Sequence, residues 1–248
     1  MRATQLRALV VSDVHSNLEA LESVIEDAKS KGGFDEIWSL GDQVGYGPDP
    51  SACIALLRLH ELRAVAGNHD LAAFGRLSLE SFNDYAAAAA RWTADQISAE
   101  EAEWMASLPL RIEVEGFTMV HGSPRDPVWE YVVSVPVAAV SFQHFTTPRC
   151  LVGHSHVPFL CVTGENGPKF LEFPLDTRVP LENERIIVNP GGVGQPRDGD
   201  PRASYAVYDS GDGTVAHFRV EYDIKTTQDK MAECGLPKYL ADRLSEGR

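Results

Sequence analysis

Five short apolar segments of the chain each end in aspartate, asparagine or histidine. They read VVSDVH, WSLGD, AVAGNHD, TMVHG and CLVGHSH, and in each one the apolar residues come first. Apolar runs of this length are typical of buried strands. In an open α/β sheet, ligands bind beyond the carboxyl ends of the strands. We therefore expect a fold in which these five strand ends meet in one crevice.

The segments between the first three strands predict helices and hence a parallel sheet. After the first strand, apolar residues recur with helical spacing, at Leu18, Leu21, Ile25 and Ala28. Before the third strand, Pro50 favours the start of a second helix. Strands that alternate with helices indicate right-handed crossovers within a parallel sheet.

The rest of the chain predicts helices and a second set of strands. We expect a helical insertion at about 71–109 and a C-terminal helical tail from about 224. A hairpin is expected around Gly116, and glycine-rich turns separate the later strand segments, one of which begins at residue 184. These strands are expected to pair mostly antiparallel. The length favours one α/β domain, 1–248, with either one mixed sheet or two stacked sheets inside outer helices.

The charge of the chain limits its partners. With 22 lysines and arginines against 36 aspartates and glutamates, the formal net charge is -14. Such a surface repels nucleic-acid backbones and anionic membranes, so we expect neither long nucleic acid nor a membrane as a partner. No apolar stretch has the length of a membrane span. The four cysteines form no C-x-x-C pair, which favours reduced thiols and a cytoplasmic protein.

Histidines concentrate at the five strand ends. The chain has 8 histidines, and five of them are in these segments, with two aspartates and one asparagine. These side chains are Asp13, His15, Asp42, Asn68, His69, His121, His154 and His156. Taken alone, each has an ordinary structural explanation, because aspartate and asparagine close turns and histidines occur in cores. Taken together, these explanations require five coincidences, so we favour one shared site.

The residue types at the strand ends are ligands for divalent metal ions. Imidazole nitrogens, carboxylates and amide oxygens together suit borderline ions such as manganese, iron, cobalt, nickel or zinc. The set is too large for one ion, and two ions that share a carboxylate are typical of two-metal hydrolases. Asp42, which stands alone after its strand, is the expected bridge. The sequence therefore predicts two divalent metal ions, with manganese favoured.

Five ordered motifs resemble those of the calcineurin-like metallophosphoesterase superfamily: D-x-H, G-D-x-x-G, G-N-H-D, H-G and G-H-x-H. They extend from about Leu9 to His156, and the segments HGSPRDP and NPGGVGQPRDGDPRASYAV are similar to its bacterial and archaeal phosphodiesterase branch. The resemblance implies a four-layer αββα sandwich, in which two stacked mixed β-sheets are flanked by helices. It also implies one metal ion held by Asp13, His15, Asp42 and His156, and a second held by Asp42, Asn68, His121 and His154.

The same resemblance gives His69 the role of catalytic acid, or of hydrogen-bond donor to the leaving oxygen. The two ions would lower the pKa of a bridging water, and the resulting hydroxide would attack phosphorus in line. Two dications also leave the pocket locally cationic on an acidic protein. The implied enzyme is a binuclear metal-dependent phosphoric ester hydrolase.

The segment GDQVGYG departs from the serine/threonine phosphatases of the same superfamily, which read G-D-x-V-D-R-G. Gly45 and Tyr46 stand where those enzymes carry an aspartate that orients the histidine and an arginine that binds phosphate. This disfavours a phosphoprotein phosphatase or a dinucleoside polyphosphatase and favours monoanionic diesters. Arg125 or Arg197 can replace the arginine by bidentate contact, or each can pair with the aspartate that follows it. Tyr46 can line the substrate pocket or simply pack.

The leading hypothesis is a metal-dependent phosphodiesterase that hydrolyses small or nucleotide phosphodiesters. A nuclease, nucleotide pyrophosphatase or phosphomonoesterase is the alternative among enzymes, although the absence of a basic tract disfavours long nucleic acid. A catalytically silent scaffold of the same fold is the alternative of another class, and it is disfavoured because every expected ligand position is filled. The sequence predicts neither the physiological substrate nor the oligomeric state.

Overall fold

Two six-stranded β-sheets form the centre of the molecule. The computed structural model describes residues 5–181 and 185–248. The first sheet has the strand order β3-β2-β1-β11-β12-β9. Its strands are β1 (Arg7–Val11), β2 (Glu36–Ser39), β3 (Leu62–Ala64), β9 (Arg178–Pro180), β11 (Ala203–Asp209) and β12 (Thr214–Val220). Strands β1, β2 and β3 are parallel, as the alternation of strands and helices predicts.

The second sheet has the strand order β4-β5-β6-β10-β7-β8. Its strands are β4 (Arg111–Val114), β5 (Phe117–Val120), β6 (Arg149–Leu151), β7 (Phe159–Val162), β8 (Lys169–Leu171) and β10 (Ile186–Asn189). Strands β4 and β5 form the expected hairpin, with Glu115 and Gly116 at positive φ in the turn. Antiparallel pairs predominate, but β6 is parallel to both of its neighbours. Residue 184, where the last strand of this sheet was expected to begin, lies outside the described residues.

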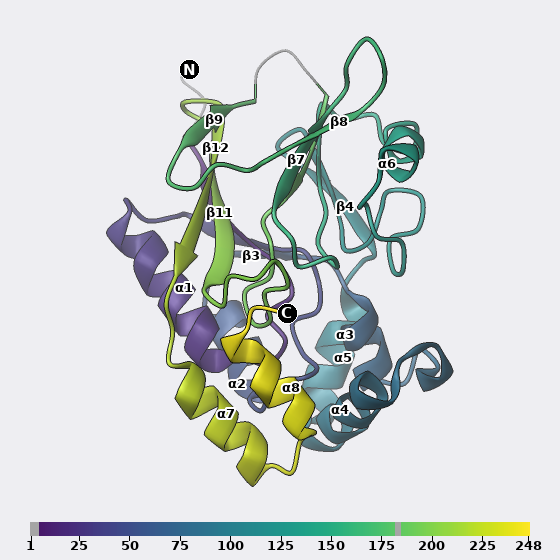
Figure 1. Cartoon of the computed structure of the whole chain (residues 1–248), viewed down its shortest axis with the longest axis vertical. Helices are drawn as coiled ribbons and strands as arrows, with labels where there is room; N and C mark the ends of the chain where they lie inside the picture. Colours follow the sequence, from purple (N-terminus) through teal and green to yellow (C-terminus); the bar gives the residue numbers. More distant parts are fainter. Residues whose placement is uncertain (1–4, 182–184) are drawn as a thin grey trace.

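Helices cover the outer faces of the two sheets and one end of the sandwich (Figure 1). They are α1 (Leu18–Ser30), α2 (Pro50–Arg58), α3 (Asn68–Ala73), α4 (Asp84–Gln96), α5 (Ala99–Ser107), α6 (Val135–Ser141), α7 (Ile224–Glu233) and α8 (Lys238–Asp242). Helix α1 lies along the sheet that contains β11, and α6 lies on the far side of the sheet that contains β7. The layers run helix, sheet, sheet, helix, so the predicted four-layer sandwich is confirmed.

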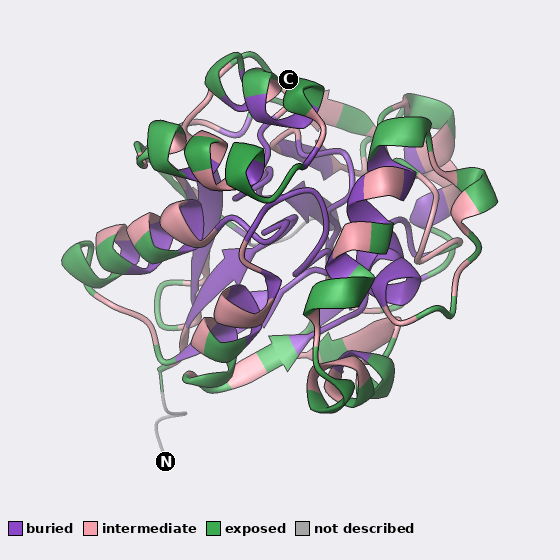
Figure 2. Ribbon diagram, turned by 90° about the horizontal axis from the view of Figure 1, so that it is seen from below, coloured by how far each residue is buried: buried purple, intermediate pink, exposed green. Residues whose placement is uncertain are grey.

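Three apolar clusters fill the spaces between these layers, and buried strands occupy the middle of Figure 2. Between the sheets, Trp38 and Phe117 are fully buried and meet edge to face, with their ring centroids 5.4 Å apart. Leu21 of α1 packs with Tyr205 on the outer face of the first sheet. Phe142, which follows α6, packs on the outer face of the second. Each sheet is thus apolar on both faces, and the polar strand ends lie at the edge of the sandwich.

Helices also fill the expected insertion and tail. Helices α4 and α5 lie in the insertion, where Ser98 and Glu101 cap α5 reciprocally, and α7 and α8 form the tail. Helix α3 begins at Asn68, ahead of the expected boundary, so Asn68 and His69 lie in a helical turn. One apolar cluster joins the insertion to the tail, and it includes Tyr46, Ala86, Met231, Leu240 and Leu244.

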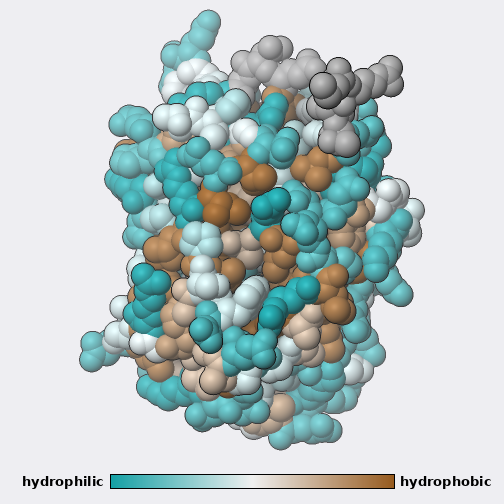
Figure 3. Space-filling model, turned by 180° about the vertical axis from the view of Figure 1, so that it is seen from behind, coloured by the Kyte–Doolittle hydropathy of each residue, from teal (hydrophilic) through white to brown (hydrophobic). Residues whose placement is uncertain are grey.

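Polar side chains cover much of the face shown in Figure 3. On the face shown in Figure 3, apolar side chains gather near the middle and polar ones surround them. Among the residues that the structure describes, no helix is long and apolar enough to cross a membrane. The four cysteines are free, and Cys53, Cys150 and Cys161 are buried.

His217 of β12 makes stability depend on pH at a point away from the strand ends. Its buried ring donates to the carbonyl oxygen of Phe173 at 3.1 Å and lies 2.8 Å from the hydroxyl of Ser204. Burial lowers the pKa of His217 to about 4, whereas an exposed histidine has a pKa of about 6.5. Between these values only the unfolded chain binds the proton, so acidification destabilises the fold by up to about 3 kcal/mol.

Replacing His217 with glutamine is expected to remove this pH dependence. The stability advantage of the wild type over His217→Gln should shrink by about 3 kcal/mol between about pH 7 and about pH 4. Urea titrations of both proteins, with a chelator present throughout, measure the difference. Parallel curves for the two proteins would show that His217 does not titrate in this range.

Candidate functional site

The polar ends of strands from both sheets converge on one site. The segments after β1, β2 and β3 supply Asp13, His15, Asp42 and Asn68, and those after β5 and β6 supply His121, His154 and His156. All seven side chains belong to buried residues, with at most 4% of their surface exposed. Positive φ angles, which non-glycine residues rarely adopt, occur at Asp13, His15, Asp42, His154 and His156. Backbone strain of this kind concentrates at functional sites, because the surrounding fold must hold it.

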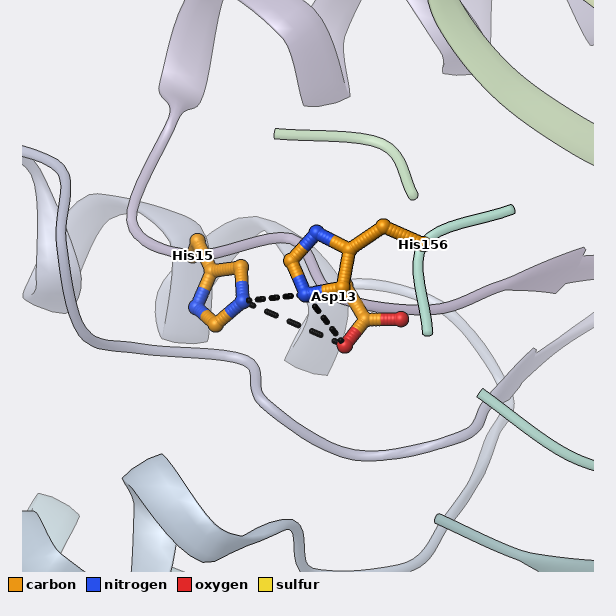
Figure 4. Close-up of side chains that lie close together, drawn as sticks. All are labelled: Asp13, His15 and His156. Carbon is orange, nitrogen blue, oxygen red and sulfur yellow. Dashed lines mark hydrogen bonds and ion pairs between the residues drawn. The ribbon is translucent and has the colours of Figure 1, made fainter. Parts of the chain in front are cut away.

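One group within the site consists of Asp13, His15 and His156 (Figure 4). The Nε2 atoms of the two histidines are 3.2 Å apart. Asp13 Oδ1 lies 3.2 Å from His156 Nε2 and 3.9 Å from His15 Nε2. This buried oxygen accepts no hydrogen bond from the described residues, although an unpartnered buried carboxylate oxygen is costly. Two ring nitrogens and one carboxylate oxygen therefore face a common point.

A second group consists of Asp42, His121 and His154, with Asn68 beside it. His121 Nε2 lies 3.3 Å from Asp42 Oδ2, 3.1 Å from Asn68 Oδ1 and 3.0 Å from His154 Nδ1. Asp42 Oδ2 is also 3.7 Å from His15 Nε2 in the first group. This one oxygen therefore lies between the two groups.

Backbone carbonyls fix which ring nitrogen of each histidine faces the site. The Nδ1 atoms of His15, His121 and His156 each donate to a backbone carbonyl, at 3.2, 2.9 and 2.5 Å. A ring that carries its proton on Nδ1 presents the Nε2 lone pair to the site, and this is how ligating histidines are usually oriented. His154 is turned the other way, because its Nδ1 faces His121.

The two carboxylates are each held through one oxygen, which leaves the other free to face the histidines. Asp13 Oδ2 accepts from the Ser12 hydroxyl at 2.6 Å and from the backbone N–H of His154 at 3.2 Å. Asp42 Oδ1 accepts from the backbone N–H of His69 at 2.8 Å. The lone pairs of these oxygens and ring nitrogens converge, and there are too few protons to pair them by hydrogen bonds. Such an arrangement is typical of a site for divalent cations and not of a hydrogen-bonded core. The donor set therefore fits the metal ions that the sequence predicts.

Asp70 holds the loops that carry these ligands. Its Oδ2 accepts the backbone N–H groups of Asp42 at 2.8 Å and Gly67 at 2.9 Å, and its Oδ1 accepts that of Val44 at 3.2 Å. Burial and the charge of Asp42 raise the pKa of Asp70 to about 7, against the effect of these N–H groups. The side chain fastens the loop after β2 to the start of α3.

Burial and close contact set the ionisation of the two site carboxylates. Burial raises the pKa of Asp13 to about 6. Burial acts in the same direction on Asp42, but the neighbouring imidazoles of His121 and His69 outweigh it and hold the pKa of Asp42 well below its usual range. At His121, burial is outweighed by Asp42, which raises the pKa of His121 to about 9. Asp42 and His121 thus form an ion pair whose proton a metal ion would displace.

The other imidazoles of the site are neutral near pH 7. Burial lowers the pKa of His154 to about 3 and those of His15 and His156 well below the usual value. Neutral imidazole is the form that binds metal ions. Burial likewise lowers the pKa of His69 to about 4. A nitrogen of His69 lies within 4.8 Å of ligand atoms of His15 and Asp42, so the residue adjoins both groups.

A pocket of about 110 Å³ opens beside the site. Besides site residues, its wall contains Tyr46, Ser81, Phe82, Asn83, Ala86, Trp129, Tyr131 and Arg197. The ring of Tyr131 stacks on that of His154, with the centroids 3.9 Å apart. A larger cavity of about 690 Å³ lies elsewhere, between Arg58, Trp104 and Ile112, and contains none of the site residues. The smaller pocket is the candidate substrate site, because it is the one that the buried site residues line.

The two predicted arginines lie in different surroundings. Arg197 lines the pocket, with its guanidinium 5.8 Å from the centre of the Tyr46 ring and hydrogen-bonded to Gln195 Oε1 at 2.9 Å. Arg125 is not among the described residues that line the pocket, and it is exposed and paired with Glu130. Neither arginine forms an ion pair, within the described parts of the chain, with the aspartate that follows it. Only Arg197 is placed to reach a substrate in the pocket.

Sequence reasoning missed three aromatic residues of the pocket wall. Phe82 comes from the insertion, and Trp129 and Tyr131 come from the segment after β5. None of them stands directly after the last residues of a strand, so the pattern that locates the ligands does not include them. The sequence offers no comparable signal for them, because Trp129 and Tyr131 lie in a long loop that also contains valines.

The chain is similar to known proteins over nearly its whole length. A family profile, the calcineurin-like phosphoesterase superfamily domain, matches residues 6–213. The uncharacterized protein MJ0912 of Methanocaldococcus jannaschii is 42% identical over 245 residues, or 96% of this chain and 97% of that protein. The crystal structure of a metallophosphoesterase from Sphaerobacter thermophilus has 46% sequence identity and a TM-score of 0.88, and covers 99% of this chain and 100% of that one.

Two more distant similarities are informative. A symmetrical bis(5'-nucleosyl)-tetraphosphatase of Shewanella sp. is 32% identical over 127 residues, which are 48% of this chain and 44% of that protein. The crystal structure of the hypothetical protein PH1004 from Pyrococcus horikoshii has 20% identity and a TM-score of 0.79, and covers 98% of both chains. The second comparison shows a shared fold alone.

Proposed function

Because the chain belongs to the calcineurin-like phosphoesterase superfamily, we propose that it is a binuclear metal-dependent phosphodiesterase that hydrolyses small or nucleotide phosphodiesters. The family is one of phosphoesterases, so hydrolysis of phosphate esters follows from membership. The two-metal centre, the diester preference and the substrate are our proposal. The observation that carries it is the position of Asp42 Oδ2 between two groups of buried ligands.

We assign the ligands to the two ions as the motifs imply. One ion would be held by Asp13, His15, Asp42 and His156, and the other by Asp42, Asn68, His121 and His154. The mixture of nitrogen and oxygen donors favours manganese, with iron, zinc, nickel or cobalt as alternatives. Ions bound there would act as Lewis acids on the phosphoryl oxygens and would lower the pKa of a coordinated water.

Two side chains of the pocket are proposed to act on the substrate directly. The guanidinium of Arg197 is placed to bind a phosphoryl oxygen with charge-assisted hydrogen bonds. His69 is placed to donate a hydrogen bond to the leaving oxygen. The aromatic rings of Phe82, Trp129 and Tyr131 limit access of bulk water, which strengthens both interactions.

The charge of the pocket supports a diester substrate. Arg197 is the one arginine or lysine among the described residues that line it. A monoester carries two negative charges near neutral pH, whereas a diester carries one and requires less positive charge to bind. Tyr46 supplies no further cation at the position where related phosphatases carry an arginine.

The size of the pocket supports a substrate that is only partly enclosed. Its volume of about 110 Å³ is well below the roughly 300–1,000 Å³ of pockets that bury a whole drug-sized ligand. The reacting phosphoryl group fits inside, and the rest of the substrate would lie over the rim. Tyr131, which lines the pocket and is 43% exposed, offers a ring on which a nucleobase could stack.

A nucleotide pyrophosphatase is the second candidate function. The similarity to the Shewanella tetraphosphatase favours it, but this similarity covers 44% of that protein. We retain the expectation that long nucleic acid and membranes are not partners, because the net charge is -14. The free cysteines support a cytoplasmic location.

Hydrolysis of bis(p-nitrophenyl) phosphate and p-nitrophenyl phosphate by the manganese-loaded protein tests the proposal. We expect kcat/KM for the diester to exceed that for the monoester by at least about tenfold. Arg197→Gln should raise KM for the diester by on the order of tenfold, because a charge-assisted hydrogen bond to phosphate is lost.

Arg125→Gln is the matched control, since Arg125 pairs with Glu130 outside the pocket. It should leave KM unchanged. A preference for the monoester would refute the diester assignment, and equal effects of the two substitutions would refute the role of Arg197.

A further inference from the structure

The Nδ1 atom of His69 is not held by a hydrogen bond from the described residues. The Nδ1 atom of His69 is buried and has no partner among the described residues. Gly45 lies against this edge of the ring, and a Cβ atom added to Gly45 would be 2.6 Å from His69 Nδ1. Gly45 also has a φ of +93°, which residues with side chains rarely adopt. Contact and backbone together therefore exclude a carboxylate at position 45.

Aromatic rings surround the imidazole of His69 instead. The Tyr46 ring lies 4.3 Å from it between centroids, with the planes at 47°. Phe82 meets the same imidazole edge to face at 5.1 Å. Tyr46 is buried and also contacts the ring of His15 at 4.6 Å. His69 thus packs against Gly45 and against the rings of Tyr46, Phe82 and His15.

Tyr46 is itself held by parts of the chain that carry no ligand. It belongs to one apolar cluster with Ala86 of the insertion and with Met231 and Leu244 of the tail. The guanidinium of Arg197 lies 5.8 Å from the centre of its ring. The insertion and the tail therefore both reach His69 through Tyr46, and the insertion also contacts it directly through Phe82.

We propose that Tyr46 is a positioning residue, which sets the orientation of His69 where related phosphatases use a carboxylate. The helical insertion and the C-terminal tail act on the site by holding Tyr46. This inference rests on the proposed function, because it presumes a catalytic task for His69. Tyr46 also lines the pocket, and its ring packs against His15 and His69.

A double-mutant cycle on the manganese-loaded protein tests the link between the two residues. Tyr46→Ala is expected to lower kcat for bis(p-nitrophenyl) phosphate by on the order of tenfold or more, with little change in KM, because a displaced catalytic group slows the reaction. In the His69→Ala background, Tyr46→Ala should change kcat by less than about twofold. Tyr46→Phe keeps the ring and should retain most of the activity.

Two kinetic results would overturn the proposal. The first is a decrease in kcat on Tyr46→Ala that is as large in the His69→Ala background as in the wild type. The second is an effect of Tyr46→Ala on KM alone, which would mean that Tyr46 acts only by contacting the substrate. Metal content is measured for every variant, and loss of metal on replacement of Tyr46 would also overturn it. If Tyr46→Ala does not fold, Tyr46→Leu preserves the apolar volume and is expected to lower kcat in the same way.

A crystal structure of the Tyr46→Leu variant supplies a readout that does not depend on turnover. The imidazole of His69 is expected to rotate or to occupy more than one orientation, while the ligands keep their places. An unchanged imidazole would contradict the positioning role. Should the wild type fail to hydrolyse the diester, the proposed function fails, and this structure still tests what holds His69.

Discussion

Replacing Asp42 with asparagine is expected to lower kcat for the diester by on the order of a thousandfold. Asp42 Oδ2 lies 3.3 Å from His121 Nε2 and 3.7 Å from His15 Nε2, so one oxygen serves both groups of ligands. Asparagine removes the negative charge that two adjacent cations would share. The variant should therefore also bind fewer metal ions. Steady-state kinetics and metal analysis of the dialysed protein measure the two effects.

Asp95→Asn is the control for this substitution. Asp95 is exposed on α4, so the same chemical change there should alter neither kcat nor metal content. Circular dichroism establishes that Asp42→Asn is folded. A folded Asp42→Asn protein with full activity would show that the two groups of ligands do not share this carboxylate.

Removal of metal ions by chelation is expected to abolish hydrolysis and to lower Tm. A ligand present at a hundredfold excess over its Kd stabilises the fold by about 2.7 kcal/mol for each site. For a chain of this length, that corresponds to a loss of on the order of 5–10 °C in Tm per site. Differential scanning calorimetry before and after dialysis against a chelator measures the change.

Adding back manganese, iron, cobalt, nickel or zinc separately should restore both properties and identify the preferred ion. Asp42→Asn is the comparison protein, and its Tm should respond less to chelation than that of the wild type. Full activity after the metal has been removed, verified by elemental analysis, would refute metal-dependent hydrolysis.

The strand ends of the site could be predicted from the sequence, because a buried strand and its polar end are adjacent in the chain. In the run from Leu9 to Asp13, the apolar strand residues and the polar residue that follows them lie within five positions of the printed sequence. The parallel pairing of β6 with β5 and β10 could not be predicted in this way. Pairing depends on which distant strands become neighbours, and local periodicity does not contain that information.

The difference between the two arginines shows the same limit. Arg125 and Arg197 both occur in a Pro-Arg-Asp sequence, so the residues beside them do not distinguish them. Tertiary contacts do: Glu130 pairs with Arg125, whereas Gln195 holds Arg197 at the pocket. The aromatic wall was missed for the same physical reason, since Phe82 and Trp129 meet at 5.2 Å from separate segments of the chain.

The construction of the site from both sheets has a consequence for the order of folding. His15 and His156 are 141 positions apart in the chain, yet their Nε2 atoms are 3.2 Å apart. In an unfolded chain, closing so long a loop has a large entropic cost, so these ligands do not come together before the sandwich forms. We therefore expect the first group of ligands to be completed only after the two sheets dock. A nascent chain that has not yet been synthesised as far as His156 lacks one ligand of the first group, so this group is incomplete until most of the chain has been made.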